Sequence, residues 1–150
     1  MGLLDDVSAV TAGAEFRRAD LHINSFGEDG SYDVTDPAMT PEAIVDTAVA
    51  ERLEVIAVTD HNAVGNVRRA IAHAAGKPIL VLPGVELSTP QGHLLVYCPT
   101  PRQLEQFVCK LGISGDRTAC EETIAVCLTR AAEFDGIGIA AHIDLSSGID

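Results

Sequence analysis

The chain has 150 residues, of which 47% are hydrophobic and only 4% aromatic, so it fits one domain with an aliphatic core rather than a disordered or many-domain chain. Ten Lys and Arg residues against 22 Asp and Glu residues give a net charge of −12, which disfavours electrostatic binding of nucleic acid by the chain alone. No apolar run approaches the roughly 18 residues of a membrane span, and the first ten residues carry no basic segment. We therefore expect a soluble, cytoplasmic protein.

Strand and helix signals alternate along the chain, which is typical of an α/β domain. Short aliphatic runs predict strands at residues 20–24, 55–58, 79–82, 93–98 and 137–141. Capping residues and helical spacing of apolar residues predict helices that begin at Pro41 and that span residues 67–75, 101–109 and 118–132. A loop rich in Gly, Asp and Ser, residues 25–39, follows the first strand. We expect a single domain over residues 1–150, with residues 1–15 as a leading segment.

Polar side chains gather where the predicted strands end. They are His22, Asp60, His61, Glu86, His93 and His142. Ligands of α/β folds bind at the carboxyl ends of strands, because side chains from several strands converge there. One histidine in such a place is more often structural than a ligand, but a group of imidazoles and carboxylates suits zinc, manganese or iron. A shared carboxylate further suits a site with several ions.

The four cysteines predict neither a zinc site nor a disulfide framework. They contain no C-x-x-C pair, and each lies in or beside an apolar stretch; they are Cys98, Cys109, Cys120 and Cys127. We expect buried thiols in a reducing compartment.

Four segments carry a resemblance to a known family. They are residues 20–25 with Asp29 and Gly30 (DLHINS, DG), residues 57–62 (AVTDHN), residues 84–89 with Gly92 and His93 (GVELST, GH), and residues 140–142 (AAH). In order and spacing, from about residue 17 to 145, they resemble the motifs of the PHP (polymerase and histidinol phosphatase) superfamily, whose first motif usually reads D-L-H-x-H-S-x-x-S-D-G.

The resemblance implies a distorted (β/α)7 barrel with two or three divalent metal ions at its mouth. It assigns His22 and Glu86 to one ion, and Glu86 with His93 and His142 to a second. Asp29 and His61 would bind a third, with Asp60 as a further ligand or as an orienter of His61. Asp60, His61 and Glu86 are the expected catalytic residues. A carboxylate between two ions would hold them close enough to activate one water for attack on phosphorus.

Two departures from the family pattern bear on this expectation. The second histidine of the first motif is Asn24 here, and an amide oxygen binds these metals less well than imidazole. The family continues beyond the fourth motif to a final motif with Asp and His ligands, so we expect an incomplete barrel, the N-terminal part of a longer product. Residues 141–144 and 146–148 resemble PHP modules fused in front of large bacterial ATPase domains.

The function expected is that of a metal-dependent phosphoesterase acting on a phosphorylated small molecule. Four basic residues are candidates to clamp the phosphate: Arg17, Arg18, Arg68 and Arg69. A nuclease of the same chemistry, acting on a nucleic-acid end, is one alternative. The other is a non-catalytic PHP module that stabilises or regulates a fused ATPase or polymerase, which Asn24 favours and the retained Glu86, His93 and His142 disfavour.

Overall fold

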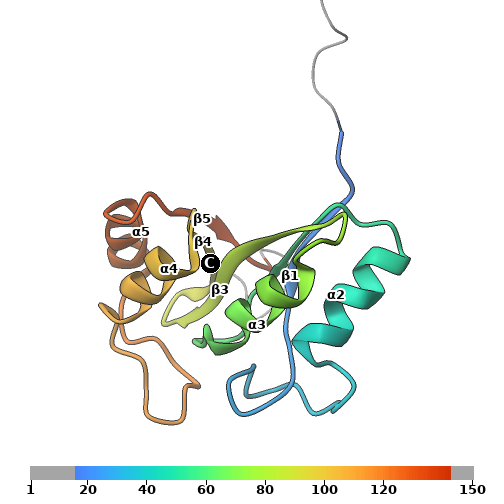
Figure 1. Ribbon diagram of the computed structural model, residues 1–150. Coiled ribbons are helices and arrows are strands. Elements are labelled where there is room, and N and C mark those ends of the chain that lie inside the picture. Colours follow the sequence, from blue (N-terminus) through green and yellow to red (C-terminus); the bar gives the residue numbers. More distant parts are fainter. Residues whose placement is uncertain (1–15, 143–150) are drawn as a thin grey trace, which may run out of the picture.

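The structure is a computed structural model that describes residues 16–142. The expected leading segment, residues 1–15, lies outside the described residues, as does most of the segment that resembles ATPase-fused PHP modules, from residue 143 on. Within this range the chain forms five strands and four helices (Figure 1). In chain order they are β1 (Ala19–Ile23), α2 (Pro41–Ala50), β2 (Val55–Val58), α3 (Gly65–Ala74), β3 (Leu80–Thr89), β4 (Gly92–Tyr97), α4 (Pro101–Val108), α5 (Ile124–Ala132) and β5 (Ile137–Ala140).

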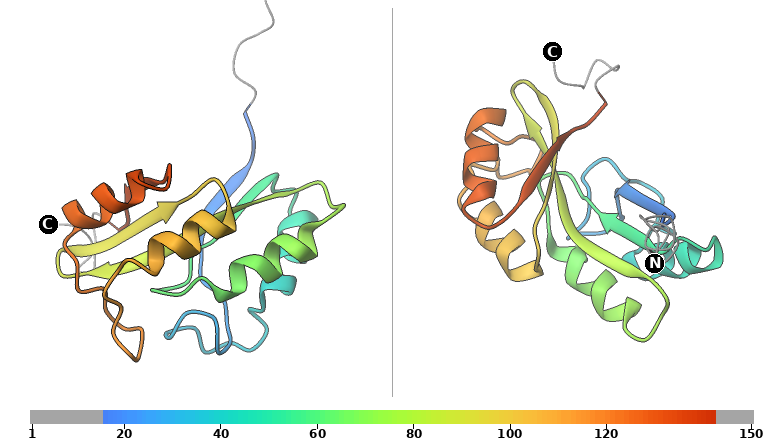
Figure 2. Two further views of the ribbon diagram at one scale, coloured as in Figure 1. Left: turned by 60° about the vertical axis from the view of Figure 1, so that its left-hand side comes forward. Right: turned by 90° about the horizontal axis from the view of Figure 1, so that it is seen from above.

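The five strands form one sheet in which the spatial order is the same as the chain order. Strands β1, β2 and β3 are parallel neighbours, whereas β4 runs antiparallel to both β3 and β5. The sheet curls, and the helices cover its convex side (Figure 2). This mixed α/β half-barrel is consistent with the incomplete barrel expected from the sequence.

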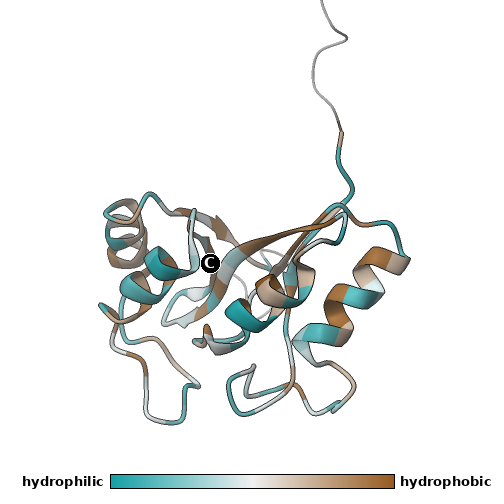
Figure 3. Ribbon diagram, viewed as in Figure 1, coloured by the Kyte–Doolittle hydropathy of each residue, from teal (hydrophilic) through white to brown (hydrophobic). Residues whose placement is uncertain are grey.

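Two apolar clusters on the convex side hold the helices to the sheet. One joins β3 and β4 to α4 and α5, with Leu104 and Phe107 fully buried in it. The other joins β1 and β2 to α2 and α3 around Val45 and Ile56. Helix α2 accordingly alternates hydrophobic and hydrophilic residues along its length (Figure 3). Burial on this side fixes the sheet curvature that brings the strand ends together on the concave side.

Several predicted elements are confirmed. Strand β2 has the predicted bounds, and α2 begins at Pro41 with the Thr40 side chain accepting a hydrogen bond from the Ala43 amide. Helix α4 has the same arrangement, with Thr100 as its cap. Both caps satisfy amide groups that the first helical turn leaves without a partner.

Strand β3 is longer than predicted, because the strand placed at residues 79–82 continues to Thr89. Proline is uncommon inside strands, since it cannot donate a hydrogen bond to a neighbouring strand. Here β3 changes partners at Pro83: it pairs with parallel β2 up to that residue and with antiparallel β4 from Gly84 on. The Pro83 carbonyl accepts a hydrogen bond from the Cys98 amide at 3.0 Å, so the strand continues.

The last helix is shorter than predicted. It begins at Ile124 rather than near residue 118, because Thr123 supplies the cap and residues 113–120 form a separate loop. The Cys120 amide in that loop donates to the Ser88 carbonyl at 2.8 Å, which removes it from the helix. Within the part of the chain described, no helix has the length and apolar character needed to cross a bilayer.

Candidate metal centre

Four imidazoles surround the carboxylate of Glu86, a side chain with no exposed surface. Glu86 Oε2 lies 2.7 Å from His22 Nε2 and 3.4 Å from His61 Nε2. Glu86 Oε1 lies 3.0 Å from His93 Nδ1 and 3.1 Å from His142 Nε2. The carboxylate is therefore the common centre of the five side chains.

The strand directions explain why distant residues meet at this point. His22 is on β1 near its carboxyl end, and His61 follows the end of β2. Glu86 lies inside β3, beyond the part that pairs with β2. Because β4 is antiparallel, its amino end lies at the same edge and supplies His93, while His142 follows the end of β5. All of these groups sit at the one edge where the parallel strands end, as the sequence predicts.

Two groups of side chains have the spacing of metal ligands, with ligand atoms within 4.8 Å of one another. One contains His22, Glu86 and His142, and the other contains His61, Glu86 and His93. The resemblance placed His142 with His93 and paired His61 with Asp29. His93 and His142 do share Glu86 Oε1, and in the grouping by distance His142 also lies with His22, while the rings of His61 and His93 have centroids 4.7 Å apart.

The charges in the cluster favour an ionised carboxylate at its centre. Burial alone would raise the pKa of Glu86, but the hydrogen bond with His22, the charge of His22 and the hydrogen bond from Asn24 outweigh it and lower that pKa to about 2. The same hydrogen bond raises the pKa of His22. Burial lowers the pKa of His61, which favours the neutral imidazole that binds metals.

The side-chain amide of Asn24 also lies beside Glu86, and its unpaired oxygen bears on whether the site suits a metal ion. Its Nδ2 donates to Glu86 Oε2 at 3.3 Å. Among buried side-chain atoms of residues 16–142, Asn24 Oδ1 and His93 Nδ1 are the two that make no hydrogen bond, although His93 Nδ1 lies 3.0 Å from Glu86 Oε1. Buried polar atoms are rarely left without a partner, and both of these are ligand atoms beside a buried carboxylate. The residues therefore fit divalent metal ions.

Serine side chains hold His61 in place. The Ser88 hydroxyl lies 3.0 Å from His61 Nδ1, which leaves Nε2 to face Glu86. The His61 amide donates to the Ser31 hydroxyl at 3.2 Å. Tyr32, from the same loop as Ser31, stacks its ring against His61 with centroids 5.2 Å apart. A partner on the second ring nitrogen orients a histidine ligand and selects its tautomer.

Asp60 lies outside both ligand groups, although it was expected to be catalytic. Its fully buried carboxylate accepts hydrogen bonds from the amide of Ser25, at 2.5 Å, and from its hydroxyl, at 2.7 and 2.9 Å. Burial raises the pKa of Asp60 to about 6, against the lowering effect of these bonds. Asp60 therefore ties the end of β2 to the segment that follows β1 and carries Asn24.

Asp29 is also outside both groups. It is exposed, and its side chain lies so close to Gly65 that a Cβ at that position would come within 2.6 Å of the Asp29 Cβ. Asp33 lies nearer the site, with Oδ2 3.6 Å from His61 Nε2. The sequence offered no signal for Asp33, because the path of the loop decides which of its carboxylates approaches the site. It did offer one for Ser88, which is two residues from Glu86 on the same face of β3.

Asn62 connects the centre to the loop between α4 and α5. It has a left-handed backbone with φ 52°, and its amide donates to the Glu86 carbonyl at 2.8 Å. Its side chain accepts from the Ser88 amide at 3.0 Å and donates to the Arg117 carbonyl at 2.8 Å. Asn tolerates this backbone conformation better than most residues. Asn62 therefore fixes the turn that follows His61 and ties it to β3.

The four arginines proposed to clamp phosphate bond to other groups. Arg17 pairs with Glu54, Arg18 with the Glu51 carbonyl, Arg68 with Glu105 and Arg69 with Glu42. Arg117, a basic residue that is not one of these four, lies closer to the site. It donates to the Glu28 carbonyl at 2.5 Å, and its charge lowers the pKa of Asp60.

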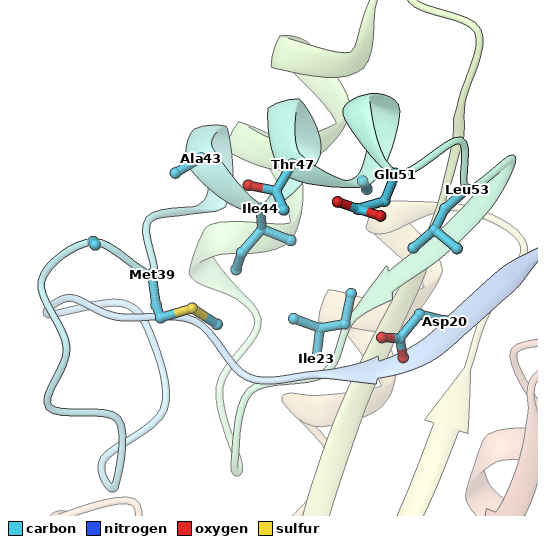
Figure 4. Close-up of a pocket in the computed structure, with 10 residues that line it drawn as sticks. Asp20, Ile23, Met39, Ala43, Ile44, Thr47, Glu51 and Leu53 are labelled. Atoms are coloured by element: carbon cyan, nitrogen blue, oxygen red, sulfur yellow. The ribbon is translucent and has the colours of Figure 1, made fainter.

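A cavity of about 300 Å³ lies apart from the histidine cluster, between β1 and α2. Ile23, Met39, Ile44 and Leu53 line it with apolar side chains (Figure 4). None of its lining residues belongs to the two ligand groups. The chemistry of the polar cluster is therefore separate from this apolar cavity.

No protein-family model matches the sequence. A curated relative, the 3',5'-nucleoside bisphosphate phosphatase of Chromobacterium violaceum, is 37% identical over 78 residues, which are 52% of this chain and 25% of that protein. The chain thus matches a quarter of that relative's length. An amidohydrolase structure from the same organism, with bound sulfate and no metal, is 30% identical over 62% of this chain and 32% of that one, with a TM-score of 0.48.

The lesion-specific endonuclease of Pyrococcus furiosus shares the fold, with a TM-score of 0.61 and 19% identity over 81% of this chain and 33% of that one. The relative named as a phosphatase supports the expected kinship with phosphoester hydrolases. The homology is consistent with a PHP superfamily domain, which the four sequence motifs indicate.

Proposed function

We propose that the chain carries the metal centre of a phosphoester hydrolase. The observation that carries this proposal is the convergence of four imidazoles on the buried carboxylate of Glu86. A purely structural carboxylate needs hydrogen-bond donors, which serine or backbone amides would supply. Four histidines around one carboxylate are instead the donor set of a site for divalent transition metals with a shared ligand.

In this proposal His22 and His142 would hold one divalent ion together with Glu86. His61 and His93 would hold a second one with the same carboxylate, and zinc, manganese and iron all suit these ligands. When bound, such ions lower the pKa of a water and offset the charge of phosphoryl oxygens. No ion is assigned to Asp29 or Asp60, because neither belongs to a ligand group.

The residues of the chain would prepare the site before substrate arrives. Glu86 stays ionised because its pKa is about 2, so the bridging ligand requires no deprotonation step. Ser88 holds the His61 ring, and Asp60 fixes the segment that carries Asn24. Ligands locked by such bonds need no reorganisation during the reaction, which is the main way a protein favours charge development at phosphorus.

We propose a small phosphorylated molecule as the substrate, in the manner of the nucleoside bisphosphate named for the relative. The net charge of −12 supports this choice over a nucleic-acid end, because a long polyanion would be repelled. A second candidate function, a module that regulates or stabilises a fused ATPase or polymerase, is favoured by Asn24, which stands where the family has a histidine.

Hydrolysis of a generic phosphate ester by the full chain tests the proposal, with zinc, manganese or iron supplied separately. We expect metal-dependent turnover that Glu86→Gln abolishes. Glu54→Gln, the same substitution at a surface residue paired with Arg17, is the matched control and should leave turnover unchanged. Metal binding without turnover would favour the regulatory module, and turnover in Glu86→Gln would contradict the shared-carboxylate centre.

A further inference from the structure

Two thiols outside the histidine cluster lie in contact with one another. The Sγ atoms of Cys120 and Cys127 are 3.9 Å apart. Both side chains are buried, with 1% and 0% exposure, in the apolar cluster that joins β3 and β4 to α4 and α5. Cys120 belongs to the loop before α5 and Cys127 to the helix itself, so the contact joins two separate pieces of structure.

We propose that Cys120 and Cys127 are a redox-sensitive pair that forms an intramolecular disulfide when a peroxide oxidises the protein. The sulfur atoms must approach from 3.9 Å to the covalent distance of about 2.05 Å. This approach requires local movement of the loop that carries Cys120, which belongs to no named helix or strand. This inference is independent of the proposed hydrolase activity.

The surroundings of the two thiols give them different roles. The Cys120 thiol hydrogen-bonds to Cys127, which lowers the pKa of the Cys127 thiol, and the charge of Arg130 also lowers it. When local opening of the loop admits the peroxide, Cys127 is therefore the thiol that ionises and reacts first, because the thiolate is the nucleophile. The Cys120 thiol also lies 3.5 Å from Glu122 Oε2, and the pKa of Cys120 is raised by its bond to Cys127 and by burial. Cys120 therefore keeps its proton until the second step.

The reaction is a two-electron oxidation of the pair. The Cys127 thiolate attacks one peroxide oxygen, the O–O bond breaks, and the departing hydroxide takes up the proton lost by Cys127 to form water. The sulfur of Cys120 then attacks the resulting sulfenic acid. The S–S bond forms as the S–O bond breaks, and the hydroxide leaves as water with the proton of Cys120. With hydrogen peroxide, two thiols are oxidised and one peroxide is reduced to two waters.

The disulfide would restrain a segment that supports the metal centre. The Cys120 amide donates to the Ser88 carbonyl, and the Ser88 hydroxyl contacts His61. The same loop offers the Arg117 carbonyl to Asn62. A covalent link from Cys120 to α5 would therefore anchor the loop at a point directly beside β3.

The sequence makes the bond simple to detect. Trypsin cleaves after Arg117 and Arg130 and at no residue between them, so both cysteines fall on the peptide of residues 118–130. A protease that cleaves after Glu121 or Glu122 separates them. The reduced full chain is treated with hydrogen peroxide, then unfolded in denaturant in the presence of iodoacetamide, which alkylates free thiols, and finally digested. We expect this peptide to be unalkylated and lighter by two hydrogen atoms, and the Glu-specific digest to leave its two halves joined.

The other two cysteines and a variant are the controls. Cys109 is exposed and Cys98 is buried, and among the described residues neither hydrogen-bonds to another thiol. After a mild peroxide dose both should therefore be alkylated, or gain oxygen without pairing. In Cys127→Ala the loss of two hydrogens should disappear. Alkylation of Cys120 and Cys127 to the same extent as Cys98 after oxidation would overturn the proposal, as would a disulfide between Cys98 and either of them.

Discussion

His22 Nε2 lies 2.7 Å from Glu86 Oε2, although 64 positions separate the two residues in the chain. One is on β1, at the edge of the sheet, and the other is on β3, with β2 between them. The inward residue of β2 is Ala57, whose small side chain belongs to the apolar patch on the concave side. The curl of the sheet and this small residue let the two side chains meet across an intervening strand.

Replacing Asn24 with histidine tests the departure from the family motif. Asn24 Nδ2 is 3.3 Å from Glu86 Oε2, so an imidazole at this position would add a ligand beside His22. We expect Asn24→His to tighten metal binding by about tenfold, equivalent to about 1.4 kcal/mol. Competition with a fluorescent chelator measures the affinity. An unchanged dissociation constant would show that residue 24 does not face the ion.

Ser88→Ala tests the support of His61. The substitution removes the hydroxyl that lies 3.0 Å from His61 Nδ1 and leaves the ring free to turn. We expect a roughly 10- to 100-fold loss of metal affinity, the usual effect of removing a partner of a ligand. Thr129→Ala, which removes an exposed hydroxyl on α5 that bonds the Ala125 carbonyl, is the control and should bind metal normally. Equal metal affinity in both variants would show that Ser88 does not orient the His61 ring.

Asn62 allows the backbone and side-chain contributions of one residue to be separated. Asn62→Gly keeps the left-handed backbone but loses the side-chain bonds to Ser88 and Arg117. Asn62→Ala loses the same bonds and adds the strain of φ 52°. We expect both to lower the free energy of unfolding, Ala by about 1 kcal/mol more than Gly. Urea unfolding measures the difference, and a Gly variant less stable than the Ala variant would contradict it.

The buried phenol of Tyr97 leads us to expect that the free energy of unfolding decreases at high pH. Its hydroxyl donates to the Leu21 carbonyl at 2.6 Å, and burial raises the pKa of Tyr97 from 10.0 to about 12. The folded state therefore keeps a proton that the unfolded state loses between these values. The resulting stabilisation is complete below pH 10 and decreases as the pH rises toward 12.

Comparison with Tyr97→Phe isolates this effect. The variant should be less stable at neutral pH by about 0.5–1.5 kcal/mol, because it loses one hydrogen bond. Its stability should also fall less steeply than that of the wild type between pH 10 and 12. Parallel pH profiles for the two proteins, measured by chemical denaturation, would show that the Tyr97 phenol is not held in its neutral form.

The sequence was sufficient to predict most of the regular elements and the edge at which the site forms. Thr40 and Thr100 mark helix starts because their side chains cap amides within one turn, which is a local property. Buried strands such as β2 are continuous aliphatic runs, and their polar ends locate His61. Local patterns of this kind depend on no distant part of the chain.

The features that the sequence could not predict depend on distant contacts. The loop after β1 brings Asp33 rather than Asp29 toward His61, and its path is held by the bonds of Ser25 to Asp60 and of Ser31 to His61. The meeting of His22, His142 and Glu86 likewise follows from the curl of the whole sheet. Spacing along the chain carries no information about either.

The amount of metal bound per chain shows whether Glu86 is the shared ligand of two ions. Elemental analysis of the full chain, purified without chelator and then reconstituted with zinc or manganese, should find two divalent ions per chain. Glu86→Gln should bind neither ion firmly, because both ligand groups share this carboxylate, while Glu54→Gln should match the wild type. A wild-type chain that binds no metal after reconstitution, or a Glu86→Gln chain that retains both ions, would contradict the account.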